Sequence, residues 1–423
     1  MNLKKMVISS IAALSIMGGS AFAADNSNGT KVALDGTGDY LVYPYYAAVG
    51  SWKTNIRVVN TNIHKAIVAK VVIRERKTSA EKRDFLIYLT PGDVWDGELV
   101  NENGQVVLKT NDDSFILPDG TSAKNVPQTI ALVKEDQVKG QPAGCKEDNT
   151  IGYVEIIGIA EIDGQLIDPY WVPYTKLNKD LLRKNYLRNV HNNTIANAQA
   201  AGWEGVDADS LTGQEVLFAK NQYGNLAMTL NATALEGVTG SQPNTLKQIG
   251  ADTSYATMII PDGALTAADV INNMSTALHK EEVYVPFYDN GNGQIAETAL
   301  VLTMPMKKYH YQVNPVVPYA QDGFYANTAI LSPMDWKVNF AMLARDTEES
   351  STKPPFSGGR GEFCNTEICA WDVSNYSKDF TNGYARLKGT NAGIPVAMTA
   401  KNIEGTNVTN IFYPSYRVVG QAE

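Results

Sequence analysis

The chain has 423 residues and a formal net charge of −9, and 44% of its residues are hydrophobic. This length exceeds one ordinary hydrophobic core, so at least two domains are expected. The acidic balance argues against nucleic acid and anionic membranes as partners, and no run approaches the eighteen apolar residues of a transmembrane helix.

The first residues have the pattern of a secretory signal peptide. Lys4 and Lys5 precede an apolar run, Met6–Met17, and Ala21-Phe22-Ala23 supplies a small-residue cleavage site. We therefore expect an exported protein at the cell surface or outside the cell, with the periplasm as the alternative. Residues 24–38 are polar and glycine-rich, and are expected to form a flexible leader.

Closely spaced strand patterns follow the leader, with apolar and polar side chains in alternation. They cover residues 52–60, 65–76, 83–90, 94–99, 105–110, 114–118 and 153–162. The segment NENG at 101–104 is a predicted hairpin turn. Short strands at this spacing predict an antiparallel, immunoglobulin-like β-sandwich over residues 39–173, within a mainly β protein.

Residues 174–281 change in character and predict a mixed α/β insert. Apolar residues recur at helical spacing between residues 176 and 202. They are Leu177, Leu181, Leu182, Leu187 and Val190. A second helical pattern begins near residue 265, where Thr266 is the expected N-cap.

A short motif then occurs for the second time. Val42-Tyr43-Pro44-Tyr45-Tyr46 is echoed by Tyr284-Val285-Pro286-Phe287-Tyr288, and each is followed by a glycine-bearing linker and a strand. The echo predicts a second, related β-sandwich over residues 282–423, although any β protein can reuse such strands. Because proline cannot donate to a ladder, Pro44 indicates a sheet edge or a bulge.

The chain also resembles a family of exported bacterial cell-surface proteins that have no assigned chemistry. The resemblance is carried by Pro44–Tyr46, Asn60–Thr61, Asp84–Phe85 and Pro91–Trp95, and it extends over most of the chain outside 174–281. It implies an exported β protein of the surface, without an activity or a ligand. Phe115 stands where the family pattern has a cysteine after paired aspartates, which leaves a disulfide at that point in doubt.

Three cysteines are present. In an oxidising compartment Cys364 and Cys369 are candidates for a small-loop disulfide, and Cys145 would then be free or paired with another chain.

Loop oxygens offer weak calcium candidates. Asp35, Asp39, Asp289 and Asn292 lie in glycine-bearing loops, and calcium takes six to eight oxygen ligands. None of these loops has the spacing of an EF-hand, and ordinary Asp-Gly and Asn-Gly turns are the alternative.

Catalytic motifs are absent from the sequence. Its four histidines are scattered, and no G-x-S-x-G segment is present. Asp96 and Glu98 lie two apart on one predicted strand, which allows a hydrolase with a carboxylate pair, but the pattern favours a solvated strand face around a packed tryptophan.

Aromatic segments could bind sugars. The segments YPYY, WVPY (Trp171–Tyr174) and VPFY are candidate platforms, and packing at sandwich edges is the alternative.

Together these patterns favour a non-enzymatic structural protein of the cell surface that assembles with its own copies into a layer, filament or matrix. The predicted contact is strand addition through residues 42–46, because an exposed strand edge is a template for another chain. The alternative is an adhesive protein that binds cell-surface polysaccharide, and a hydrolase is a third class. No cofactor is expected apart from calcium.

Overall fold

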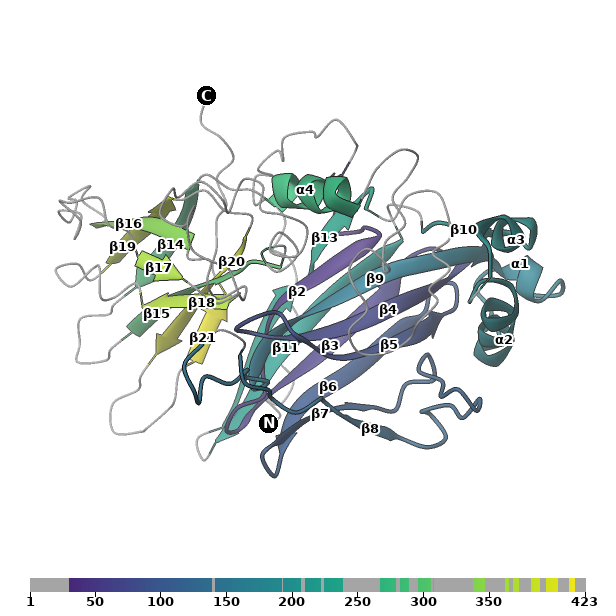
Figure 1. Cartoon of the computed structure of the whole chain (residues 1–423), viewed down its shortest axis with the longest axis horizontal. Coiled ribbons are helices and arrows are strands. Elements are labelled where there is room, and N and C mark those ends of the chain that lie inside the picture. Colours follow the sequence, from purple (N-terminus) through teal and green to yellow (C-terminus); the bar gives the residue numbers. More distant parts are fainter. Residues whose placement is uncertain are drawn as a thin grey trace, which may run out of the picture.

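The structure is a computed structural model of the chain. It describes residues 30–138, 141–191, 193–206, 210–221, 224–238, 267–278, 282–288, 296–305, 307, 338–346, 362–364, 368–372, 382–388, 393–401 and 411–414. The protein is mainly β, as expected, and every strand pair among the described residues is antiparallel (Figure 1). Among the described helices, none has the length and apolar character that a membrane crossing requires.

Two sheets form the first half of the molecule. Sheet I contains, in spatial order, β1 (Lys31–Val32), β13 (Thr233–Glu236), β2 (Tyr40–Ala47), β9 (Ile151–Asp163), β4 (Lys65–Glu75) and β5 (Glu81–Leu89), and β10 (Trp203–Glu204) pairs with β9. Sheet II contains β12 (Gly224–Asn231), β11 (Leu211–Asn221), β3 (Trp52–Asn60), β6 (Val94–Glu102), β7 (Gln105–Thr110) and β8 (Gln128–Ala131).

The two sheets enclose an apolar core. Ile67, Val71 and Ile73 of β4 lie in one buried cluster with Ile56 of β3 and Trp95 of β6. Alternate residues of a strand point to opposite faces, so the residues between these on β4 lie on the outer face of sheet I. That outer face is also buried, which a simple two-layer sandwich would not require.

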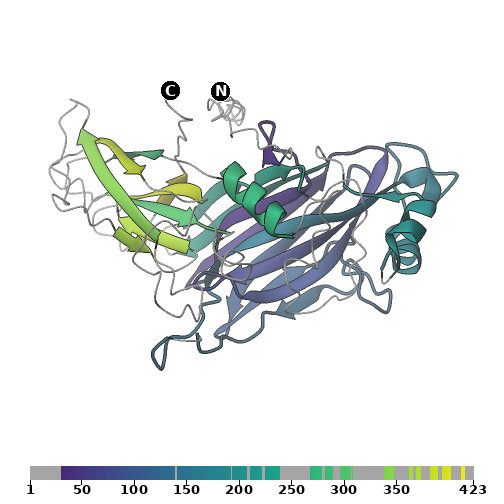
Figure 2. The ribbon, with the colours of Figure 1, turned by 45° about the horizontal axis from the view of Figure 1, so that its top comes forward.

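Helices and the second half of the chain cover this outer face. The helices are α1 (Gly164–Ile167), α2 (Lys179–Asn189), α3 (Ile195–Ala200) and α4 (Ala267–Leu278). Val68 and Val72 of β4 share a cluster with Leu182 of α2, Met274 of α4 and Leu302 of the second half. Figure 2 shows α4 lying across the strands, whereas α1 to α3 lie together at the end of the molecule away from the second half.

Two further sheets form the second half. Sheet III contains β14 (Glu282–Tyr288), β19 (Asn382–Lys388), β16 (Val338–Asp346) and β17 (Glu362–Cys364). Sheet IV contains β18 (Ile368–Asp372), β15 (Ala296–Thr303), β20 (Ile394–Lys401) and β21 (Ile411–Pro414).

The two halves have the same strand order. If the strands β2, β3, β4, β5, β6, β9, β11 and β12 are matched in chain order to β14 through β21, every neighbour relation of sheets III and IV is found in sheets I and II. The two echo strands, β2 and β14, therefore occupy equivalent positions. The first half adds β1, β7, β8, β10 and β13 to this shared order.

The domain boundary expected at residue 173 does not hold for the sheets. Strands β10 to β13 come from the segment expected as an insert, and they pair within sheets I and II. The expected flexible leader is also partly ordered, because β1 pairs with β13 and Gly38 bonds Leu211 through both backbone groups.

Local expectations had mixed outcomes. The hairpin turn at 101–104 is confirmed, with Asn103 and Gly104 both at positive φ, as a tight two-residue turn requires. The helix expected over 176–202 is divided into α2 and α3, and residues 114–118 form no strand beyond an isolated bridge at Ile116. Thr266 lies outside the described residues.

Candidate functional site: the tyrosine loop and its cavity

The loop between α1 and α2 displays two tyrosines to solvent. We call residues 168–176 the tyrosine loop. Tyr170 is 93% exposed and Tyr174 is 85% exposed, and Val172 between them is also exposed. The loop lies at the end of the molecule formed by α1, α2 and α3 (Figure 1).

A buried tryptophan holds this loop in place. Trp171 is only 4% exposed, and its indole Nε1 donates to the carbonyl of Thr175 at 2.9 Å. Its ring packs on Gly164, where a Cβ atom would lie 2.5 Å from the ring, so this position requires glycine. The Asp168 carboxylate accepts the backbone N–H of Tyr170 at 3.0 Å. The flanking tyrosines are therefore presented from a fixed base.

The backbone of Tyr174 is strained. Its φ is +65°, in the left-handed region that bulky residues rarely adopt. Such a conformation costs of the order of 1–2 kcal/mol and persists only when the surrounding structure imposes it. Here the Thr175 side chain fixes the turn by donating to the Val172 carbonyl at 2.6 Å.

A cavity of about 440 Å³ lies where the loop meets the start of α2. Its polar lining comes from Asp113, Ser122, Lys176, Asn178, Lys179 and Asp180. Tyr174 is two residues from Lys176, so the exposed tyrosines and the cavity are adjacent along the chain. The volume is within the usual range of small-ligand pockets.

One buried lysine organises the floor of this site. Lys179 is 7% exposed, and its ammonium lies 2.7 Å from Asp93 Oδ2, contacts the Asp113 carboxylate and donates to Ser114 Oγ at 2.8 Å. Asp112 lies farther away, at 3.8 Å. We call these five residues the Lys179 cluster. It joins the first turn of α2 to the loops that follow β5 and β7.

Electrostatics separate the two neighbouring aspartates. Burial acts to raise the pKa of Asp113, but hydrogen bonds from Lys179 and Lys176 outweigh it and lower that pKa to about 2. Burial raises the pKa of Asp112, whose carboxylate accepts the Ser114 N–H at 2.7 Å. Each carboxylate thus has a hydrogen-bond partner within the protein.

The strand expected to mediate assembly is interior, which corrects its predicted edge position. β2 lies between β13 and β9, and Tyr43 and Tyr46 are fully buried. Residues 233–235 return to pair with Tyr40–Val42, which removes the edge over the first part of β2. Farther along the strand, the Pro44 carbonyl accepts the Thr303 hydroxyl and the Tyr45 N–H donates to Glu215. The bulge that Pro44 predicted is confirmed, since the register of β2 on β9 shifts between Tyr43 and Tyr46.

Two of the calcium candidates, Asp35 and Asp39, lie within the described residues, and each accepts hydrogen bonds from the protein itself. Asp35 closes a local turn by accepting the N–H and hydroxyl of Thr37 at 3.0 and 2.9 Å. Asp39 is buried and accepts the N–H of Val238 at 2.9 Å. Asp289 and Asn292 lie outside the described residues. Within the described part of the chain, no group of three or more acidic, histidine or cysteine residues is arranged to hold a metal ion.

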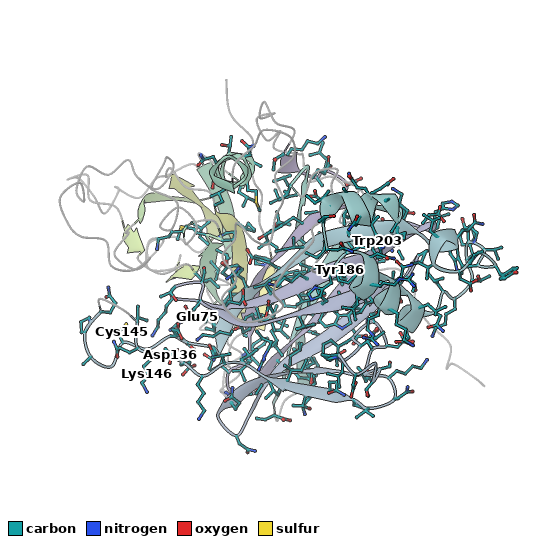
Figure 3. The ribbon with its side chains drawn as sticks, turned by 45° about the vertical axis from the view of Figure 1, so that its right-hand side comes forward. Glu75, Asp136, Cys145, Lys146, Tyr186 and Trp203 are labelled. Atoms are coloured by element: carbon teal, nitrogen blue, oxygen red, sulfur yellow. The ribbon has the colours of Figure 1, made fainter. Side chains whose placement is uncertain are left out.

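The three cysteines lie on three different segments of the fold. Cys145 is a free thiol on a loop that projects from the sandwich (Figure 3). Cys364 ends β17 in sheet III, whereas Cys369 lies in β18 of sheet IV. The disulfide between these two cysteines stays a prediction.

The carboxylate pair on β6 has ordinary surface partners. Asp96 and Glu98 do share one face of the strand, opposite the buried Trp95. Glu98 lies 2.5 Å from the Lys53 ammonium, and Asp96 is directly across from Arg57 on β3. Glu98 thus forms a cross-strand ion pair, and Asp96 lies in register with a basic residue of the neighbouring strand.

The aromatic platforms expected from sequence have different environments. YPYY is largely buried, and the side chains of VPFY lie outside the described residues. WVPY combines the buried Trp171 with the exposed Tyr174. Sequence reasoning missed Tyr170 and the Lys179 cluster, although the flanking Pro169 and Pro173 were a signal of a stiff loop.

Comparisons with known proteins give no relative: no protein-family model, no curated protein and no solved structure matches this chain.

Proposed function

We propose that this protein is an exported, non-enzymatic structural protein of the cell surface, one subunit of a layer, filament or matrix. The observation that carries the proposal is the joint between the two halves. Repeated sandwiches that are packed firmly against each other form a stiff building unit, which a surface assembly needs. The signal-peptide pattern and the family resemblance support export to the surface.

The joint uses both hydrogen bonds and apolar packing. Thr303 Oγ1 of β15 donates to the Pro44 carbonyl at 2.5 Å, and the Ile368 N–H donates to the Arg76 carbonyl at 3.0 Å. Val301 and Leu302 are buried in the same cluster as the outer face of sheet I. The bulge at Pro44 thus turns a carbonyl of β2 towards the second half, and the 42–46 segment joins the halves within one chain.

The contact between copies must then lie elsewhere than in residues 42–46. The edge at β5 is also covered, because the Tyr88 N–H donates to Ser114 and the Lys82 carbonyl accepts the N–H of Val133. Covered edges protect against uncontrolled strand pairing. We therefore propose assembly through faces and ends of the stiff unit, in place of strand addition at β2.

We also propose that both halves are distant variants of the immunoglobulin sandwich. In each half the second strand of the shared order pairs with the fifth, and the third pairs with the sixth, as in immunoglobulin domains. The first and seventh strands exchange sheets relative to that fold. In this interpretation, the segment between the halves supplies strands β10 to β13 of the first sandwich and α4.

The test is the state of the protein on cells and in solution. Electron microscopy of the cell surface, with mass spectrometry of sheared material, should find the protein in an ordered surface structure. Sedimentation of the purified mature chain, with and without calcium, should show self-association. A chain that stays monomeric in both conditions and is missing from sheared material would refute the proposal.

A further inference from the structure

We propose that the tyrosine loop and the adjoining cavity form a binding site for a hydroxyl-rich, uncharged polysaccharide. The inference is independent of self-assembly, because it concerns what the α1–α2 end of the molecule binds. Three observations carry it: the display of the tyrosine rings, the polar lining of the cavity, and the balance of charge around it.

The display of Tyr170 and Tyr174 suits stacking on sugar rings. A pyranose has faces of C–H groups and a rim of hydroxyls, so it matches an aromatic ring bordered by polar groups. Both tyrosine rings are almost fully exposed and are attached to a loop whose base is fixed by the buried Trp171. A ligand that stacks here meets side chains with few rotatable bonds, which limits the entropy lost on binding.

The cavity supplies the hydrogen bonds that stacking lacks. The Asp113 and Asp180 carboxylates accept hydrogen bonds, Ser122 and Asn178 both donate and accept, and the ammonium of Lys176 donates. These groups come from the loop after β7 and from the start of α2. A sugar unit in contact with Tyr174 would thus place its hydroxyls towards a ready set of donors and acceptors.

The charge around the cavity selects against an ionic ligand. Lys176 lies 2.9 Å from Asp113, and Lys184 lies 2.6 Å from Asp180, so exposed cations already have carboxylate neighbours. The chain as a whole carries −9, which repels polyanions at long range. A neutral ligand that binds through its hydroxyl groups is compatible with both the ion pairs at the cavity and the negative net charge of the chain.

A protein partner fits this surface less well. The centres of protein interfaces are depleted of charged residues, whereas four of the six polar residues that line this cavity are charged. The apolar side chains of Leu166 and Val172 are also exposed in this region. Binding of a second copy of the chain at this surface would therefore count against the proposal.

The test is affinity electrophoresis of the mature full-length protein in gels that contain hydroxyethyl cellulose, glycogen, galactomannan or alginate. We expect at least one of the three neutral polymers to retard the protein. The retardation should be the same in about 0.5 M salt, which screens the charges on the protein surface. The double variant Tyr170→Ala/Tyr174→Ala should weaken the interaction about tenfold or more. Tyr170→Phe/Tyr174→Phe should keep most of it, because the rings remain.

Controls separate the site from the fold and from assembly. Val49→Ala changes an exposed apolar residue in the turn between β2 and β3, outside the proposed site, and should leave retardation unchanged. Circular dichroism verifies that each variant is folded, and sedimentation follows self-association. The proposal is overturned if a folded protein binds none of the neutral polymers, or binds alginate alone in a salt-sensitive way. It is equally overturned if the alanine variant loses self-association and keeps its retardation.

Discussion

The outer face of sheet I and the tyrosine loop both depart from the usual rule that charged side chains are exposed and aromatic side chains are buried. On the sheet, charged side chains are buried: Arg74 and Glu155 form an ion pair that is almost inaccessible to solvent, and Tyr40 donates to the same carboxylate. On the loop, large aromatic side chains are exposed. Buried charges require partners, whereas exposed aromatics are retained without any partner in the fold.

This difference separates stability from recognition. The Arg74–Glu155 pair is extended by Ser79, whose carbonyl accepts Arg74 Nη1 at 3.1 Å and whose hydroxyl accepts the phenol of Tyr153 at 2.7 Å. A network of this kind specifies how the covering layers pack on sheet I, and it has no access to an external ligand. Tyr170 and Tyr174 contribute little to packing, and we assign them to binding.

The largest expected effect is loss of one member of the buried pair. Glu155→Ala leaves the Arg74 guanidinium buried without its carboxylate and should reduce the free energy of unfolding by about 3–5 kcal/mol. Urea denaturation of the full chain measures this. Glu102→Ala, which removes the exposed partner of Lys109, is the matched control and should cost less than about 1 kcal/mol. Similar losses for the two variants would contradict the assigned role of burial.

Loss of the loop anchor should have the next largest effect. Trp171→Ala removes a buried ring from the base of the tyrosine loop and should cost about 3 kcal/mol, in line with other large-to-small core changes. Because the ring packs on Gly164, the damage should concentrate between α1 and α2. Limited proteolysis should cut there first, while Val172→Ala should leave the loop resistant. Unchanged resistance of the Trp171 variant would show that the anchor is elsewhere.

Sequence patterns predicted the parts of the fold that depend on local order. The alternating segments at 52–60 and 65–76 are strands, and the 101–104 turn is a hairpin. The edge position of β2 was wrong because its neighbour comes from residues 233–236, and a local pattern does not contain such a distant partner. The exposure of Tyr174 depends in the same way on the burial of Trp171 against Gly164.

The buried carboxyl group of Glu215 gives a third expected effect, which depends on pH. Glu215 of β11 is fully buried, and one of its oxygens accepts the Tyr45 N–H at 3.3 Å. Its other oxygen has no hydrogen-bond partner in the part of the chain that the structure describes. Burial raises the pKa of Glu215 well above its ordinary value of 4.5.

The sign of the effect follows from this raised pKa. Stability from the protonated Glu215 is fully present below the unfolded-state pKa and is lost as pH rises towards the folded-state pKa, by about 1.4 kcal/mol per pH unit. Glu215→Gln should therefore be more stable than the natural chain at pH 7 and nearly equal to it at pH 4. Urea denaturation at the two pH values measures the difference. An advantage for the natural chain at pH 7 would mean that Glu215 is ionised and paired in the fold.

The Lys179 cluster predicts a smaller effect with the opposite sign. The pKa of Asp113 is about 2 in the folded chain, below its ordinary value of 3.8, so its stabilisation is present above pH 3.8 and is lost as pH falls towards 2. After allowance for partial solvent exposure, Asp113→Asn should cost roughly 1–2 kcal/mol at pH 7. The difference should disappear near pH 2. Asp136→Asn, at an exposed loop position, is the control, and a pH-independent loss at Asp113 would point to packing instead of charge.

The smallest expected change in stability comes from a substitution in the exposed tyrosine loop. Tyr174→Gly removes an exposed ring and gives the left-handed backbone the residue that adopts it without strain, so the folded chain should be unchanged or stabilised by up to about 1 kcal/mol. Polysaccharide retardation of the same variant should fall, because a stacking surface is lost. Tyr170→Ser, at ordinary φ, should lower retardation without any gain in stability. If Tyr174→Gly instead destabilised the chain by more than 1 kcal/mol, the ring would contribute to packing, and the division between a buried structural face and an exposed binding loop would fail at this residue.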